Sequence, residues 1–177
     1  QINKTLILQP NTTAWMYFSR KVKNPKINDI RNGFKNFIYQ LEQNHFEYDL
    51  GSENVLKEIG SIRDNELRVG LRDYSLVVIP AEMENIDQST LDLLSKFLIN
   101  GGKILSFNPD IEYVDGIESP DVNELAGKYP DLWTVAENLH DPAALKNLTS
   151  DKIEIKDQTR NGMLYHQRRI LDDGQLL

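Results

Sequence analysis

The stretch "YSLVVIPAEMENIDQSTLDLLSKFLINGGKILSF", residues 74–107, decides the fold of this chain. Its first residues, up to Pro80, are continuously apolar, which predicts a strand buried on both faces, as in a parallel sheet. An amphipathic helix follows, with Ser89 as the expected N-cap. Gly101 and Gly102 are expected to end this helix in the left-handed conformation, and "KILSFNP" then predicts the next central strand.

The residues before this stretch continue the same alternation of strands and helices. Residues 6–8 form a short apolar run ended by Pro10. Apolar residues at helical spacing predict a helix over residues 28–45, with Asn28 or Asp29 as its N-cap. Three shorter elements are expected next: a strand in "FEYDLGS", a helix in "ENVLKEIGS" and a brief strand in "ELRVG".

The resulting order, β-α-β-α-(β)-β-α-β, predicts a three-layer α/β fold. Its sheet is expected to be doubly wound and mainly parallel, with helices on both faces. Flavodoxin-like and class I glutamine-amidotransferase-like proteins share this arrangement. We expect the α/β domain to span residues 1–150.

The rest of the chain has a different pattern. After Pro109 there are scattered turns and one short helix, "DPAALKNLTS" is a further candidate helix, and "KIEIKD" and "MLYHQRRI" alternate like strands. The final "RRILDDGQLL" predicts a strand, an Asp-Gly turn and a returning strand. We therefore expect a short irregular or antiparallel C-terminal part over residues 151–177 that leads into a following domain. Since the chain also starts at Gln1, we expect it to be cut from a longer polypeptide.

Composition excludes several classes of function. The chain has 177 residues and a formal charge of −7, with no dense stripe of Lys and Arg, which argues against a nucleic-acid partner. No apolar run approaches the roughly 20 residues of a membrane helix, so no membrane partner is expected. There are no cysteines, which excludes disulfides, thiolate metal sites and a cysteine nucleophile.

Ligands of open α/β sheets bind beyond the carboxyl ends of the strands, so the loops there indicate the chemistry. The first such loop, "QPNTTAWMY", has no glycine, and a dinucleotide site needs glycines at this turn. Its bulky aromatic run also does not fit the phosphate loop of a flavodoxin, and the acidic residues of a phosphoacceptor receiver are missing. No G-x-S-x-G elbow replaces the absent cysteine. We expect no cofactor in this chain.

The remaining candidates are polar and aromatic residues at the same edge. "AEMENID" places Glu82 and Glu84 in one loop, where a pair of carboxylates can do acid/base work, although a solvated acidic loop is the favoured interpretation. The three histidines lie far apart with no ligand spacing, so no metal site is expected. Trp15 and Tyr17 follow the first strand and Asn108 follows "ILSF". The candidate docking or sugar-contacting residues are Trp15, Tyr17, Glu82, Glu84 and Asn108.

Residues 74–107 resemble the central segment of an amidotransferase-like domain found inside multidomain bacterial glycoside hydrolases. This domain is the trimerisation domain of the family 42 β-galactosidases, and related domains occur in rhamnosidase-type enzymes. The family pattern is a strand ending in Leu-Val-Val-hydrophobic-Pro, a loop, a helix, Gly-Gly and a second strand. The opening "LILQPNTTAWMYF" and the final "MLYHQRRILDDGQLL" are similar to the phrases that flank such domains.

The resemblance implies a non-catalytic accessory domain of a secreted or periplasmic bacterial glycoside hydrolase. Such a domain docks on a catalytic domain of the same polypeptide or completes the rim of its active site, and further copies of the chain are another candidate partner. An interface would suit the "WMYF" run, since aromatic residues and Met are enriched at interfaces, so we expect Trp15 or Tyr17 to be exposed. The alternative is an independent carbohydrate-binding module that uses Trp15, Tyr17, Tyr113 and Trp133. A third hypothesis is a hydrolase that uses Glu82 or Glu84.

Overall fold

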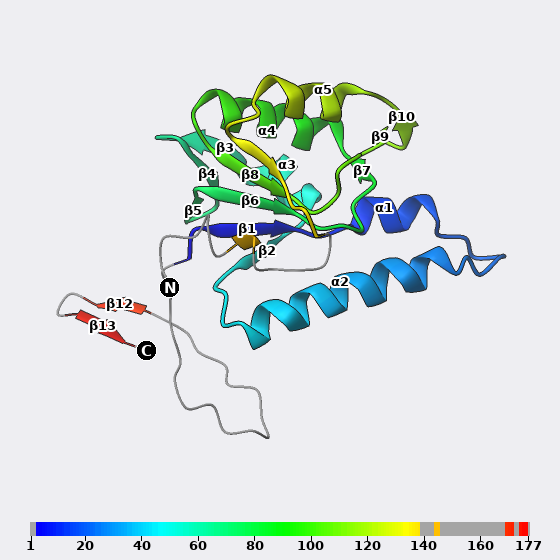
Figure 1. The fold of residues 1–177 in the computed structure, drawn as a ribbon, viewed down its shortest axis with the longest axis horizontal. Helices are drawn as coiled ribbons and strands as arrows, with labels where there is room; N and C mark the ends of the chain where they lie inside the picture. The colour runs from blue at the N-terminus through cyan, green and yellow to red at the C-terminus, as the bar shows by residue number, and fades with distance from the viewer. Residues whose placement is uncertain (1–2, 139–143, 146–168, 172–173, 177) are drawn as a thin grey trace.

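A five-stranded parallel sheet forms the centre of the protein (Figure 1). The structure is a computed structural model that describes residues 3–138, 144–145, 169–171 and 174–176. Every neighbouring pair of strands in this sheet is parallel. The predicted α/β class with a parallel sheet is therefore confirmed. From one edge to the other, the strands are β2 (Asp49–Gly51), β1 (Thr5–Leu8), β6 (Leu76–Ile79), β8 (Lys103–Ser106) and β11 (Trp133–Val135).

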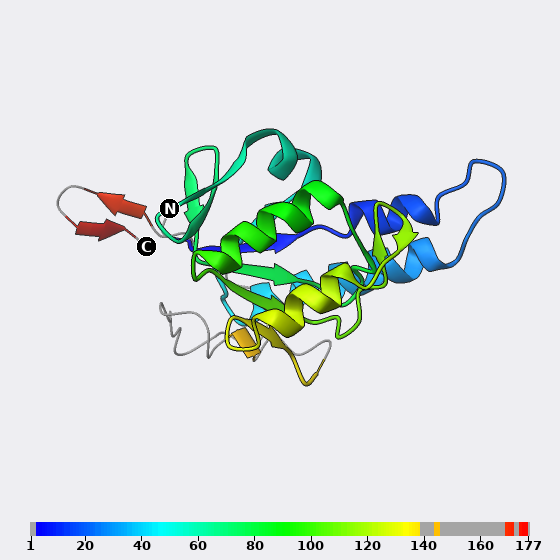
Figure 2. The same ribbon diagram turned by 90° about the horizontal axis from the view of Figure 1, so that it is seen from above.

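Alternation along the strands sends side chains into two separate cores. In β1, Leu6 and Leu8 belong to one hydrophobic cluster and Ile7 belongs to the other, because successive residues of a strand point to opposite faces. Helix α2 (Lys26–Gln43) covers one face with Phe37 and Leu41. The other face is covered by α3 (Glu53–Ile59), α4 (Gln88–Ile99) and α5 (Asp121–Lys128), as Figures 1 and 2 show.

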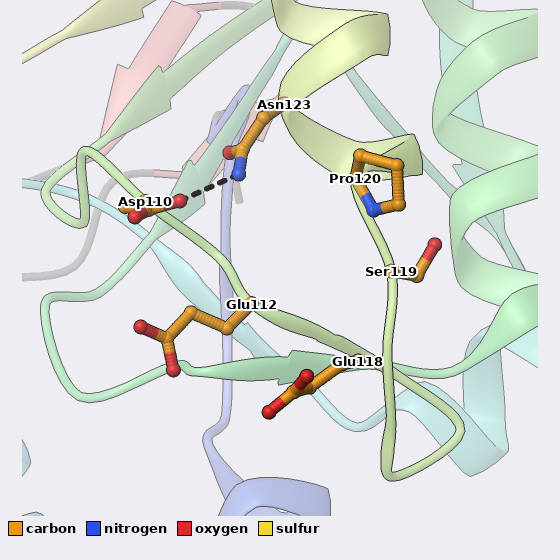
Figure 3. Close-up of a pocket in the computed structure, with 6 residues that line it drawn as sticks. All are labelled: Asp110, Glu112, Glu118, Ser119, Pro120 and Asn123. Atoms are coloured by element: carbon orange, nitrogen blue, oxygen red, sulfur yellow. Dashed lines mark hydrogen bonds between the residues drawn. The ribbon is translucent and has the colours of Figure 1, made fainter.

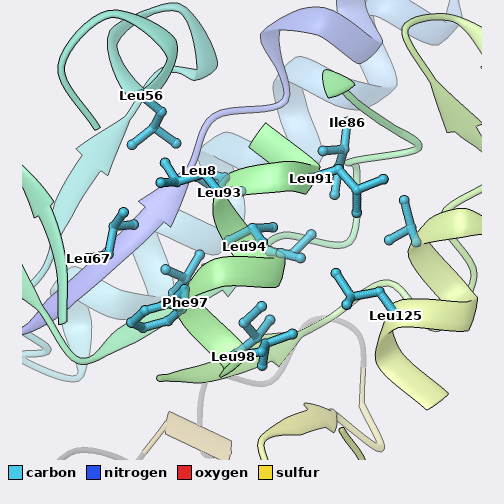
Figure 4. Close-up of a cluster of buried hydrophobic side chains, with 14 of the residues drawn as sticks. Leu8, Leu56, Leu67, Ile86, Leu91, Leu93, Leu94, Phe97, Leu98 and Leu125 are labelled. Atoms are coloured by element: carbon cyan, nitrogen blue, oxygen red, sulfur yellow. The ribbon is translucent and has the colours of Figure 1, made fainter. Parts of the chain in front are cut away.

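The larger core centres on α4, whose apolar side turns toward the sheet (Figure 4). Leu94, Phe97 and Leu98 are almost completely buried there. Each such side chain contributes about 1.5–3 kcal/mol when it leaves water. The predicted N-cap is wrong: the helix begins at Gln88, and Asp87, in an extended conformation, occupies the cap position in place of Ser89. Both residue types can cap a helix, so composition alone did not choose between them.

The other end of α4 closes as its glycines predict. Gly101 has a φ of +85°, and its amide and that of Gly102 donate to the carbonyls of Leu98 and Phe97, both at 2.9 Å. These bonds satisfy carbonyl groups that the last turn would leave without a partner. Gly102 also lies directly against the ring of Phe97, so the chain can enter β8 only if this position lacks a side chain.

One predicted loop and one predicted helix boundary differ from the structure. Trp15 lies in a short helix, α1 (Asn11–Met16), and not in an irregular loop. Pro10, whose carbonyl accepts the amide of Ala14, starts this helix. Helix α2 begins at Lys26, two residues earlier than predicted, because Pro25 already has helical dihedral angles and suits a helix start.

The structure also contains three small sheets. The brief strand predicted in "ELRVG" is β4 (Glu66–Val69), the middle of an antiparallel sheet whose other strands were not predicted. Tyr74 belongs to this sheet and not to the buried strand that follows it. The remaining strands are β3 (Gly60–Arg63), β5 (Arg72–Tyr74), β7 (Asn85–Ile86), β9 (Tyr113–Val114), β10 (Ile117–Glu118), β12 (Arg169–Leu171) and β13 (Gly174–Leu176).

The part after Pro109 is more regular than predicted. β11 adds a fifth parallel strand where only scattered turns and one short helix were expected, and α5 is that helix. Strands β12 and β13 pair antiparallel, which agrees with the strand, turn and returning strand predicted at the end of the chain. Most of "DPAALKNLTS", all of "KIEIKD" and most of "MLYHQRRI" lie outside the described residues.

The contact between Gly102 and Phe97 gives a test of the fold. A Cβ atom at position 102 would lie 2.1 Å from the Phe97 ring, which is completely buried and has no free space to enter. We expect Gly102→Ala to lower the free energy of unfolding by about 1–3 kcal/mol, measured by urea denaturation.

Gly127→Ala is the matched control. Gly127 lies in the last turn of α5, and a Cβ atom there would meet no atom within 4 Å. Alanine should leave the stability unchanged or raise it by up to about 1 kcal/mol. Equal effects of the two substitutions would contradict the packing role of Gly102.

Candidate functional site

The chain itself occupies the position where an open α/β sheet usually binds its ligand. The strand order reverses between β1 and β6, and ligands of this architecture sit beyond the carboxyl ends of those two strands. Here Thr13, which follows β1, and Met83, which follows β6, are both completely buried. The Thr13 hydroxyl oxygen accepts the backbone amides of Glu84 and Asn85, each at 3.0 Å. These bonds fasten α1 onto the β6–β7 segment.

Asn108 extends this fastening to the next strand. Its side-chain amide donates to the carbonyl of Met83 at 2.8 Å, and the hydroxyl of Ser106 donates to the carbonyl of Asn108 at 2.6 Å. Asn108 is half-buried. Its amide is therefore used to join the ends of β6 and β8, which is a structural role for this predicted site residue.

Glu84 joins the two ends of the connection between α1 and α2. One carboxylate oxygen accepts the hydroxyl of Tyr17 at 2.6 Å, and the other lies 2.5 Å from the ammonium group of Lys26. The same ammonium group lies 5.7 Å from the centre of the Tyr17 ring, within the range of a cation–π contact. The structure thus brings together two of the predicted site residues, Tyr17 and Glu84, and adds Lys26, which the sequence did not single out.

The protonation of this group follows from its contacts. The hydrogen bond that Tyr17 donates to Glu84, together with burial, raises the pKa of Tyr17 to about 12. The contact with Glu84 also raises the pKa of Lys26. Both shifts favour the protonated forms of Tyr17 and Lys26, so at neutral pH these two side chains are a neutral phenol and an ammonium ion that both contact Glu84.

Glu82 points elsewhere. Its carboxylate lies directly against the backbone of Gly33 in α2, where an added Cβ atom would meet it at 2.2 Å. Glu84 instead contacts Tyr17 and Lys26. Each glutamate of this loop makes its own structural contact, Glu82 with α2 and Glu84 with the connection that leads into α2. The structure therefore gives no support to the hypothesis that the two carboxylates act together as acid and base.

Trp15 is the candidate that stays available to a partner. Its side chain is 61% exposed, which confirms that Trp15 or Tyr17 is exposed. Phe18, next to it in the chain, is 62% exposed. Of the two other aromatic candidates, Trp133 is buried in the core and cannot stack on a sugar, whereas Tyr113 is partly exposed.

A second group, Glu53 with Thr12, was not predicted from the sequence. Glu53 is only 2% exposed. Its carboxylate accepts the Thr12 hydroxyl at 2.5 Å and the backbone amide of Asp87 at 2.9 Å. Burial raises the pKa of Glu53 to about 7. A threonine beside such a carboxylate has the composition of a nucleophile and its base. Thr12 is itself buried, however, so a substrate has no access to it. The pair connects α1, α3 and the start of α4.

An open cleft of about 420 Å³ lies near the β9–β10 hairpin and the start of α5 (Figure 3). Three of its lining residues are acidic: Asp110, Glu112 and Glu118. The amide of Asn123 donates to Asp110 at 2.6 Å and so fixes that side of the cleft. Among the described residues, no group of three or more His, Cys, Asp and Glu side chains could hold a metal ion.

No protein-family model matches the chain, and no curated protein matches it at a significant level. In the part of the chain that the structure describes, there is no helix with the length and apolar character needed to cross a membrane. The functional interpretation therefore depends on the geometry of the carboxyl edge.

The buried carboxylate of Glu53 predicts a dependence of stability on pH. A carboxyl group whose pKa is about 7 in the folded protein and 4.5 in the unfolded chain stabilises the fold fully below pH 4.5. That contribution is lost as the pH rises through about 7, and it amounts to about 3 kcal/mol. Glu53→Gln should remove this slope, measured by urea denaturation between pH 4.5 and 8.

The comparison of the two proteins isolates Glu53. The pKa of Asp87 is also raised by burial, but that contribution is present in both proteins and cancels in the difference. Parallel stability curves for the wild type and Glu53→Gln would show that Glu53 does not take up a proton on folding.

The hydroxyl of Thr13 gives a second test. Thr13→Val keeps the shape of the side chain but removes the acceptor of two backbone amides, so we expect a loss of about 1–3 kcal/mol in the free energy of unfolding. Thr134→Val, at an exposed position of β11, is the control and should stay within about 0.5 kcal/mol of the wild type. A similar small effect at both positions would mean that the carboxyl edge does not depend on Thr13.

Proposed function

We propose that this chain is a non-catalytic accessory domain of a secreted or periplasmic bacterial glycoside hydrolase. It docks on a neighbouring catalytic domain of the same polypeptide or completes the rim of its active site. The strand order of the central sheet, numbered along the chain, is 2-1-3-4-5, which is the order of flavodoxin-like sheets. This order supports the finer assignment to a flavodoxin-like or amidotransferase-like fold that the resemblance implies.

The observation that carries the proposal is an exposed aromatic side chain beside a filled ligand position. Thr13 and Met83 occupy the place of a ligand, while Trp15, two residues after Thr13, is 61% exposed. A large apolar side chain in water gains free energy when a partner covers it, and Trp is among the residues that contribute most at interfaces. The edge that would bind a substrate in other proteins of this architecture is therefore suited to contact a protein surface.

The same side chain also favours one alternative, an independent carbohydrate-binding module. An exposed indole can stack on the apolar face of a sugar. Of the other aromatic candidates, Trp133 is buried and the hydroxyl of Tyr17 is bonded to Glu84. A sugar site would then rest mainly on Trp15, with Tyr113 as the remaining partly exposed aromatic candidate.

The docking proposal predicts a large effect of Trp15→Ser. With the domain and the neighbouring catalytic domain produced as separate proteins, we expect this substitution to weaken their association roughly tenfold or more, measured by calorimetry. Tyr39→Ser is the matched control, because Tyr39 is also an exposed aromatic residue but lies in the middle of α2. It should leave the association unchanged.

Two results would count against docking. The first is a reading frame with no hydrolase domain beside this one. The second is an equal effect of the Trp15 and Tyr39 substitutions. Saturable binding of an oligosaccharide to the isolated chain, lost in Trp15→Ser, would instead establish the carbohydrate-binding alternative.

A further inference from the structure

The connection between α1 and α2 carries a concentration of positive charge on an acidic protein. We define the arm as residues 18–25, which leave the body of the protein between Tyr17 and Lys26 and project beyond the carboxyl edge of the sheet (Figures 1 and 2). Arg20, Lys21 and Lys23 are all exposed. The chain as a whole has a net charge of −7, so this segment differs from the rest in the sign of its charge.

Within the described part of the chain, no ion pair neutralises the charges of the arm. The described residues include no carboxylate that forms an ion pair with Arg20, Lys21 or Lys23. The arm also exposes apolar side chains: Phe18 is 62% exposed and Val22 is 67% exposed. A segment that combines unpaired cations with exposed apolar groups is suited to an acidic surface with an apolar contact at its centre.

The same chain offers such a surface. The cleft lined by Asp110, Glu112 and Glu118 carries three carboxylates, and within the described part of the chain none of them is paired with Lys or Arg. Pro120, an exposed apolar residue, also lines this cleft. The cleft is thus complementary to the arm in charge and also supplies an apolar contact.

We propose that two copies of this chain form a dimer in which the arm of each copy lies in the acidic cleft of the other. The arm and the β9–β10 hairpin, which contributes residues to the cleft, lie at the same end of the molecule, at the carboxyl edge of the sheet (Figure 2). One two-fold rotation can therefore form both contacts at once, which is the usual symmetry of a dimer. Glu84 anchors both ends of the arm through Tyr17 and Lys26, so the arm is held at its base for this contact.

This dimer is a separate proposal from the docking of Trp15 on a catalytic domain. It needs only copies of this chain and depends on the arm and the cleft, whereas docking depends on Trp15. Loss of one contact through substitution can therefore be distinguished from loss of the other.

Charge reversal tests the dimer in the full 177-residue chain. Two variants are made, Lys21→Glu/Lys23→Glu in the arm and Glu112→Lys/Glu118→Lys in the cleft, and their association is measured by sedimentation velocity over a range of concentrations. Each variant alone juxtaposes like charges, so we expect the dissociation constant to rise roughly tenfold or more. Salt should also weaken the wild-type dimer, because exposed charges are screened.

The decisive measurement is an equimolar mixture of the two variants. In the mixed dimer, the acidic arm of the first variant lies in the basic cleft of the second. The unchanged arm of the second variant lies in the unchanged cleft of the first, as in the wild type. The mixture should therefore regain the wild-type dissociation constant. In a closed ring of three copies, each arm would lie in the cleft of the next copy, and two copies of the same variant would always be neighbours. Their contact would join like charges, so the mixture would not restore such a ring.

Lys103→Glu/Lys128→Glu is the control for net charge, since both lysines are exposed outside the arm and the substitutions change the total charge as the arm variant does. It should dimerise like the wild type. Thermal unfolding of each variant separates loss of the dimer from loss of the fold. A wild type that stays monomeric at all concentrations, a dimer that tolerates the arm reversal in a folded variant, or a mixture that fails to associate would each overturn the proposal.

Discussion

The hydroxyl group of Thr13 determines what the carboxyl edge of this protein can do. By accepting two consecutive backbone amides of the β6–β7 segment, it fixes α1 across the ends of β1 and β6. Buried backbone amides need acceptors, and in other proteins of this architecture such groups can face a ligand. Here the chain supplies the acceptor itself. The consequence is an edge that the chain itself fills, with Trp15 and Phe18 exposed on it.

The electrostatics of the edge follow from this closure. Glu53, below α1, is removed from water and holds a proton more tightly, because burial disfavours its charged form. Glu84, further out, accepts the Tyr17 hydroxyl and pairs with Lys26. Beyond this group, the cations of the arm form no ion pair with any described residue. The base of the arm is thus held by a paired carboxylate, whereas the charges of the arm itself face solvent.

The sequence predicted the elements whose signal is local. Continuous apolar runs such as "LVVIP" identify buried parallel strands, and a Gly-Gly pair identifies the end of α4. It failed where long-range contacts decide. β11 is a three-residue strand with two exposed positions, and only pairing with β8 makes it part of the sheet. Glu53 looks like an ordinary first-turn glutamate, and its burial depends on Thr12, 41 residues away. The site residues Tyr17 and Glu84 were predicted by position, but their mutual contact was not.

The filling of the carboxyl edge is built partly from the core and partly from polar contacts. The two hydrophobic cores lie on the faces of the sheet, and Met83 extends the larger core to the carboxyl edge because it belongs to that cluster. Thr13 is a buried polar residue outside both clusters, and its hydroxyl holds α1 against the β6–β7 segment. Trp15 can then serve a contact with another protein surface, and selection on that surface need not compromise the core.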